Sequence, residues 1–214
     1  MKTSLLAAVL VAVGAFASGS NAYAGTIIPY PNKDTFNPEH YTFTATATGP
    51  LIGYFYSFNA ADTDEIAMSV NGGPLGAFGL VNQTTPIGQT FNFGNVTNGD
   101  ALTFVLRDVS MVTDISSNPA SNGDLAQHVY SVAYTNPGPF AVVGIPTGTF
   151  VSFEDRLVSQ GSDFDYNDDA FVFTNVSSGT TPIPAALPLF ATGLGGLGLL
   201  AWRRKRKIAA IAAA

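Results

Sequence analysis

Six carboxylates lie within sixteen consecutive positions of this chain, and they are the residues best suited to chemistry. They are Glu154, Asp155, Asp163, Asp165, Asp168 and Asp169, with Arg156 as the one cation among them. Like charges at about 4 Å repel by about 1 kcal/mol even in water, and by more where they are partly buried. The run therefore predicts a bound counter-ion.

The spacing of the oxygen-bearing side chains favours calcium as that counter-ion. Asp163, Asp165 and Asn167 offer oxygens at every second position, and Ca²⁺ takes about 6–8 oxygen ligands at about 2.3–2.6 Å. The segment is not an EF-hand, because Asp168 stands where that loop needs glycine and Thr174 where it needs glutamate. We expect calcium ligands from Glu154, Asp155, Asp163, Asp165, Asn167 and Asp168.

Two other interpretations of these acids remain open. In the first, Asp and Asn side chains cap turns by accepting backbone hydrogen bonds, and no metal is involved. In the second, Glu154 and Asp165 form the carboxylate pair of a glycan hydrolase, with carboxyls about 5–9.5 Å apart. A hydrolase also needs a cleft that holds the sugar, and the acid run alone does not distinguish it from a metal loop. We expect no catalytic residues and no enzymatic activity.

The remaining polar candidates carry weaker signals. His40 and His128 lack a flanking motif, so we expect surface or strand positions rather than ligands. The acidic segment 62–65 precedes a predicted strand, and we expect a solvated turn there rather than a second calcium site. The absence of cysteine excludes disulfides, thiolate metal sites and a cysteine nucleophile.

The distribution of charge excludes nucleic acid as a partner. The formal net charge is −6, but six of the nine cations lie near the two ends of the chain. Between Gly25 and Pro184 three cations stand against fifteen acids, a net charge of −12. Such a surface repels polyanions and attracts hard cations.

The first 24 residues have the three parts of a secretory signal. Lys2 is the basic part, residues 5–17 are apolar, and residues 22–24 form a small-residue cleavage site. We expect signal peptidase to cut between Ala24 and Gly25, so that the chain is exported. An uncleaved anchor is the alternative, but the apolar stretch is short for a membrane span.

The other end of the chain combines a proline motif, an apolar stretch and a basic cluster. The motif includes Pro182, Pro184 and Ala185, and residues 185–202 would form roughly 27 Å of helix, close to the hydrocarbon thickness. The basic cluster that stops transfer consists of Arg203, Arg204, Lys205, Arg206 and Lys207. We expect one transmembrane helix with this cluster in the cytoplasm, serving as a plain anchor or as a sorting signal.

This tail resembles the C-terminal sorting signal of the PEP-CTERM family of Gram-negative bacteria. Ile183 stands between the prolines, as in the Val-Pro-Leu-Pro-Ala variant of that signal, and residues 208–214 extend past its usual end. The resemblance implies cleavage near Pro182, Pro184 and Ala185 by exosortase, a membrane enzyme similar to cysteine transpeptidases. It also implies transient residence in the inner membrane and delivery to the cell surface or an exopolysaccharide matrix.

The acid run resembles the end of an extracellular β-domain found in bacterial surface proteins. The shared pattern is Glu-Asp followed by Asp-x-Asp-Tyr-Asn-Asp, and it falls here on Glu154, Asp155, Asp163, Asp165, Tyr166, Asn167 and Asp168. The resemblance implies a calcium site within a β-sandwich and no known enzymatic activity.

Period-two alternation predicts half-buried strands through the middle of the chain. It occurs in residues 41–48, 66–70, 91–93, 102–106 and 129–134, and continuous apolar runs at 51–58, 76–81 and 140–145 predict more deeply buried strands. Asn71-Gly72 predicts a hairpin turn, and residues 113–127 a long loop. We expect an all-β fold, an antiparallel β-sandwich of jelly-roll type, with a closed barrel as the alternative.

These patterns predict three segments: a signal peptide (1–24), a β-sandwich domain (25–178) and a sorting signal (179–214). The expected function is that of an exported, non-enzymatic surface or exopolysaccharide-matrix protein that binds calcium. The alternative is a carbohydrate-binding module for extracellular polysaccharide, with an exposed tyrosine from residues 54–56 stacked on a sugar ring.

Overall fold

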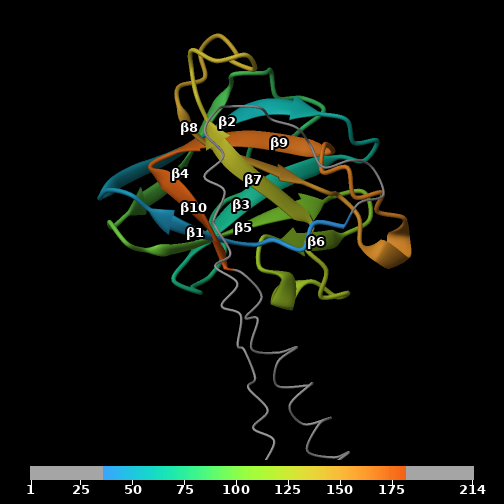
Figure 1. Ribbon diagram of the computed structural model, residues 1–214. Coiled ribbons are helices and arrows are strands. Elements are labelled where there is room, and N and C mark those ends of the chain that lie inside the picture. Colours follow the sequence, from blue (N-terminus) through green and yellow to red (C-terminus); the bar gives the residue numbers. More distant parts are fainter. Residues whose placement is uncertain (1–35, 182–214) are drawn as a thin grey trace, which may run out of the picture.

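The computed structural model describes residues 36–181, which form two antiparallel β-sheets with almost no helix (Figure 1). One sheet has the order β10-β1-β5-β3 with β6 also paired to β5, and the other has the order β4-β2-β9-β8-β7. The strands are β1 (His40–Ala45), β2 (Gly49–Phe58), β3 (Asp64–Val70), β4 (Thr90–Val96), β5 (Ala101–Asp108), β6 (Thr113–Ser116), β7 (Val129–Tyr134), β8 (Gly148–Phe153), β9 (Asp169–Thr174) and β10 (Val176–Thr181). Two short 3₁₀ helices, η1 (Pro119–Ser121) and η2 (Val158–Gln160), lie in loops. The all-β, two-sheet expectation is confirmed; the expected signal peptide and C-terminal helix lie outside the described residues.

Alternating apolar side chains from both sheets form one core between them. In β5 these are Leu102, Phe104 and Leu106, and in β9 they are Phe171 and Phe173. The rings of Phe104 and Phe173 stack across the sheets with centroids 4.1 Å apart. Because side chains alternate in a strand, every second residue of these strands points between the sheets.

A second apolar cluster covers the outer face of the β2-β9-β8-β7 sheet. The loop between β7 and β8 folds back over this face, and its Ile145 is buried against Phe150 and Val172. The hydroxyl of Tyr56 donates a hydrogen bond to the carbonyl of Phe140 at 3.0 Å. The expected strand at 140–145 is therefore wrong: those residues are apolar because they cover a sheet, not because they extend it.

Two other local expectations need correction. Residues 76–81 make only one isolated bridge, that of Gly79 with Ile66, and form no strand. The turn at Asn71-Gly72 is present, with positive φ at both residues, as a type I′ turn requires. The expected loop at 113–127 contains β6 and η1.

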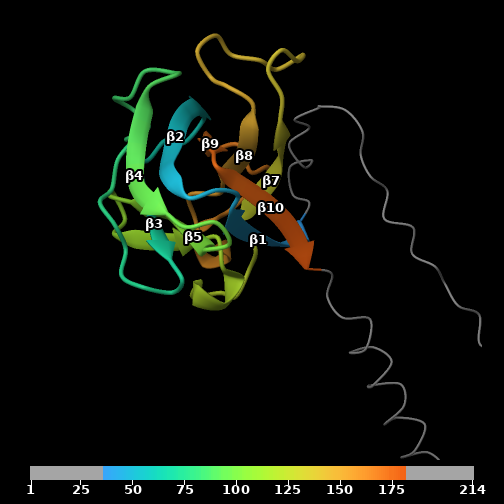
Figure 2. The same cartoon turned by 90° about the vertical axis from the view of Figure 1, so that its left-hand side faces the viewer.

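The chain begins and ends its described part in neighbouring strands. β1 pairs along its whole length with β10, from His40 opposite Thr181 to Ala45 opposite Val176. Both views show these strands side by side (Figures 1 and 2). The second and ninth strands pair in the same way in the other sheet.

Candidate metal site

The acid run forms the loop between β8 and β9, which contains the orange η2 turn at the right of Figure 1. The last residue of β8, Phe153, pairs with the first of β9, Asp169. The loop from Glu154 to Asp168 therefore leaves the sheet and returns to it at one place. This brings side chains more than ten positions apart into contact.

Glu154 is the buried centre around which this loop folds. Its carboxylate accepts hydrogen bonds from the Ser162 hydroxyl and from the backbone N–H groups of Phe164 and Tyr166. Phe164 and Tyr166 both have left-handed backbones, with φ of 55° and 56°. Such conformations cost about 1–3 kcal/mol each in non-glycine residues, and here they turn both N–H groups toward one carboxylate. Burial raises the pKa of Glu154, and the three donors oppose that effect.

Glu154, Asp163 and Asp165 bring one carboxylate oxygen each into a group in which all three oxygens lie within 4.8 Å of one another. Oxygens that share a Ca²⁺ at about 2.3–2.6 Å are separated by at most about 5 Å. One ion can therefore contact all three carboxylates. Asp163 and Asp165 are half-buried, which leaves water access for the remaining ligands of the ion.

The other three expected ligands do not join this group. The side-chain oxygen of Asn167 accepts a hydrogen bond from the amide of Asn59 at 3.0 Å. The backbone N–H of Asp155 donates to Oδ2 of Asp168 at 3.1 Å. Burial raises the pKa of Asp168 to about 7, and the negative charge of Asp155 contributes to this rise. Burial also raises the pKa of Asp155 to about 6. This pair belongs to a neighbouring acidic cluster.

That neighbouring cluster contains residues that we did not expect to be functional. Asp64 and Asp169 interact directly, and Asp62 and Asp108 lie near them. The expectation of a solvated turn at 62–65 is wrong for Asp64, whose exposed fraction is 0%. The signal that could have revealed it is the alternation of β3, which places Asp64 on the face of Ile66.

His128 packs against the loop and is not part of the three-carboxylate group. It precedes β7 and is fully buried, contrary to a surface position, with Nε2 2.9 Å from Oδ2 of Asp124. Its ring stacks on that of Phe164 with centroids 6.0 Å apart. His40 is the first residue of β1, as a strand position requires.

Tyr166 anchors the loop to two other segments, and its loss has a predictable effect. Its hydroxyl accepts from the N–H of Asn37 at 2.9 Å and donates to the carbonyl of Gln127 at 3.1 Å. Tyr166→Phe leaves both buried groups without this partner, so we expect a loss of about 1–3 kcal/mol in unfolding free energy. Urea denaturation checks this; an unchanged midpoint would show that these bonds do not hold the segments together.

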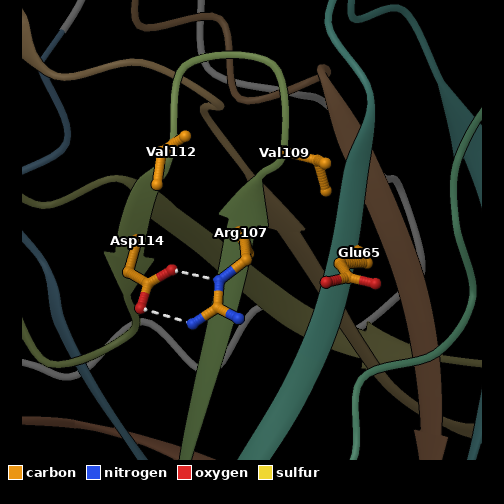
Figure 3. A pocket seen from close by; sticks show the side chains of 5 residues that line it. All are labelled: Glu65, Arg107, Val109, Val112 and Asp114. Atoms are coloured by element: carbon orange, nitrogen blue, oxygen red, sulfur yellow. Dashed lines mark hydrogen bonds and ion pairs between the residues drawn. The ribbon is translucent and has the colours of Figure 1, made fainter.

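A separate surface hollow of about 400 Å³ lies over β3, β5 and the β5–β6 turn (Figure 3). In it Arg107 makes a two-pronged ion pair with Asp114, at 2.8 and 3.0 Å, beside Glu65. The five described residues that line the hollow include no aromatic side chain, although the Arg107 guanidinium lies over the ring of Phe78, 4.0 Å from its centroid. The tyrosines expected as a sugar platform, Tyr54 and Tyr56, are half-buried against the second apolar cluster.

Comparison with models of protein families, with curated proteins and with solved structures gives no match for this chain. Within residues 36–181, no helix has the length and apolar character that a membrane crossing needs. The expected sorting motif at Pro182, Pro184 and Ala185 and the basic cluster at 203–207 lie outside the described residues, as does the cleavage site at Ala24.

Proposed function

We propose that this chain is an exported, non-enzymatic protein of the cell surface or exopolysaccharide matrix, whose β-sandwich binds calcium. The observation that carries the proposal is the group of three carboxylates from Glu154, Asp163 and Asp165, each within 4.8 Å of the others. The buried Glu154 accepts hydrogen bonds from its own loop, and Asp163 and Asp165 of that loop are half-buried.

The chemistry of the group favours calcium over other ions. All three donors are carboxylate oxygens, which suit hard cations rather than zinc or copper. Mg²⁺ requires near-ideal octahedral geometry at about 2.0–2.1 Å, whereas Ca²⁺ accepts irregular sites with longer bonds. Extracellular calcium modules have Kd values of about 10⁻⁴–10⁻³ M, and ligand charge count sets the affinity.

Direct titration tests the calcium proposal. We expect Asp163→Asn combined with Asp165→Asn to remove calcium binding at this group, because two anionic ligands become neutral without a change of shape. The matched control is Asp114→Asn, which removes a carboxylate from the surface ion pair with Arg107. Isothermal titration of the mature protein with Ca²⁺ measures the effect, and binding that is equal in the double variant and the control would contradict the proposal.

The two ends of the chain support export and sorting. A signal peptide at 1–24 and a PEP-CTERM-like tail at 179–214 require signal peptidase and exosortase as partners. We expect surface protein from the native host to begin at Gly25 and to lack residues 187–214, and to keep the tail in a host without exosortase. Mass spectrometry of the protein from both hosts distinguishes a sorting signal from a plain membrane anchor. Surface protein from the native host that still carries the basic cluster 203–207 would support the plain anchor.

We also propose that the sandwich is a variant of the jelly roll. The pairing of β1 with β10 and of β2 with β9 supports this, because a jelly roll winds the two halves of the chain together as pairs of strands. The neighbour of β1 on its other side is β5, which distinguishes this order from the simplest roll.

A further inference from the structure

Three aspartates occupy strand positions that point into the core. Asp64 is the first residue of β3, Asp108 the last of β5 and Asp169 the first of β9. Each stands two positions from a core residue of its strand, so alternation turns its side chain between the sheets. All three have an exposed fraction of 0%. We call them the inter-sheet aspartates.

The inter-sheet aspartates meet at one end of the sandwich. Asp64 and Asp108 are direct partners in the β3–β5 pair, and Asp169 comes from the opposite sheet. The amide of Asn82 joins the two sides, donating to Oδ2 of Asp64 at 2.8 Å and to Oδ2 of Asp169 at 3.3 Å. Its orientation is fixed, because its oxygen accepts from the N–H groups of Asp64 and Gln83.

Each inter-sheet aspartate has one oxygen held in place and one without a donor. Asp108 accepts from the N–H groups of Ser110 and Met111 through Oδ1, at 2.7 and 2.9 Å. Among the described residues, no N–H or hydroxyl group donates to Oδ2 of Asp108 or to Oδ1 of Asp64 and Asp169. A buried charged oxygen without a partner costs several kcal/mol, so these three atoms point to a ligand.

The chain supplies little positive charge to this cluster. Residues 36–181 contain two basic side chains besides histidine, Arg107 and Arg156. Arg107 pairs with Asp114 on the surface, and Arg156 pairs with Asp62 at 2.6 Å and lies 3.9 Å from Asp155. The inter-sheet aspartates therefore have no direct ion pair with either arginine. Burial raises the pKa of Asp64 to about 7 and that of Asp169 well above the usual range.

We propose that a second calcium ion binds between the two sheets, at Asp64, Asp108 and Asp169. This site is separate from the Glu154 group and goes beyond the function proposed above. The Asp155–Asp168 pair lies beside it and extends its negative field toward the surface. Unlike the Glu154 group, these three aspartates do not have one oxygen each within 4.8 Å of one another, so a shared ion must draw the carboxylates closer. Calcium suits such a spread set because it accepts longer and less regular bonds than Mg²⁺. The ion joins the two sheets at this end.

Counting calcium ions tests the proposal, with two single variants designed to keep the fold. In Asp64→Asn the new amide donates to Asp169, as a shared proton would. In Asp108→Asn the oxygen still accepts from Ser110 and Met111, and the new N–H₂ group faces the acids. Native mass spectrometry and isothermal titration of the mature protein with Ca²⁺ give the number bound, and circular dichroism checks the fold.

We expect the wild type and the Asp114→Asn control to bind two calcium ions, and each of the two inter-sheet variants to bind one. The Asp163→Asn/Asp165→Asn protein should also bind one calcium ion, because it loses the ion at the Glu154 group and keeps the ion at the inter-sheet aspartates. A wild type that binds a single ion, retained in both inter-sheet variants, would overturn this site while leaving the Glu154 site intact. A single ion that is lost in the inter-sheet variants and retained in the Asp163/Asp165 variant would support this site and refute the other.

Discussion

Replacing Glu154 by glutamine is expected to lower the free energy of unfolding by about 3 kcal/mol, the loss that follows when a buried, charge-assisted group is mismatched with its partners. The carboxylate accepts from the Ser162 hydroxyl and from the N–H groups of Phe164 and Tyr166. Glutamine keeps the shape but turns an N–H₂ group toward donors that need an acceptor. For a domain of this size the change corresponds to a fall in Tm of roughly 10 °C.

Chemical denaturation in EDTA measures this effect without any contribution from metal. The matched control is Asp163→Asn, which removes the same charge from a half-buried member of the same group and should change stability by less than about 0.5 kcal/mol. Equal stability of Glu154→Gln and the wild type would show that the carboxylate does not hold the loop.

In the absence of metal, we expect stability to fall as pH rises from about 5 to about 7.5, with a loss in Tm of roughly 10 °C. Burial raises the pKa of Asp64 and Asp168 to about 7, that of Asp155 to about 6 and that of Asp169 well above its usual range. The folded state therefore keeps protons that the unfolded chain releases above about pH 4. The stabilisation is complete at a pH below the pKa that these carboxyls have in the unfolded chain. It is lost as the pH rises through the pKa values that they have in the folded protein.

Calcium should reduce this pH dependence, because an ion bound at Asp64 and Asp169 replaces their protons. The charged groups that also face the four acids are Asp62, Asp108, Glu154, Asp165 and Arg156. Thermal melts across pH, with EDTA and with millimolar Ca²⁺, give the two profiles. Asp64→Asn should make the EDTA profile less steep, because its amide imitates the protonated form of one of the four acids. An EDTA profile that rises toward neutral pH would contradict the proton-holding cluster.

The sequence predicts which acids lie close together only where they belong to one short loop. Charge density and spacing predicted a group that includes Glu154, Asp163 and Asp165, and these lie together because one loop carries them. Asp155 and Asp168 are adjacent in sequence to that group but pair with each other. The directions of these two side chains depend on the path by which the loop returns to β9. The spacing of residues in the sequence does not determine that path.

The inter-sheet aspartates show what period-two reasoning misses at strand ends. Alternation in the sequence predicts a strand that begins at Ile66 and leaves Asp64 in a turn. In the structure Asp64 continues the inner-face series of Ile66 and Met68. Asp108 continues the series of Leu106 in the same way. That β3 and β9 lie in different sheets and meet at one end follows from topology, which a single sequence does not reveal.

Apolar content was also ambiguous on the outer face of the second sheet. Residues 140–145 have the composition of a buried strand, and Ile145 is buried, but the segment is a covering loop. A short apolar run shows that a segment is buried or packs over an apolar surface. Only its backbone hydrogen bonds decide whether it is a strand.

The most direct test of the central claim, that these carboxylates bind calcium rather than cap turns, is the thermal melt of the mature protein at neutral pH. With calcium at a hundredfold excess over Kd, binding to the folded state adds about 2.7 kcal/mol, or roughly 5–10 °C in Tm. We predict this rise relative to EDTA with about 10 mM Ca²⁺, a hundredfold excess over a Kd of about 10⁻⁴ M. We also predict a much smaller rise with Mg²⁺ and a reduced rise in Asp163→Asn/Asp165→Asn. A wild-type melt that is the same in EDTA and in millimolar Ca²⁺ would contradict the account and return the acids to turn capping.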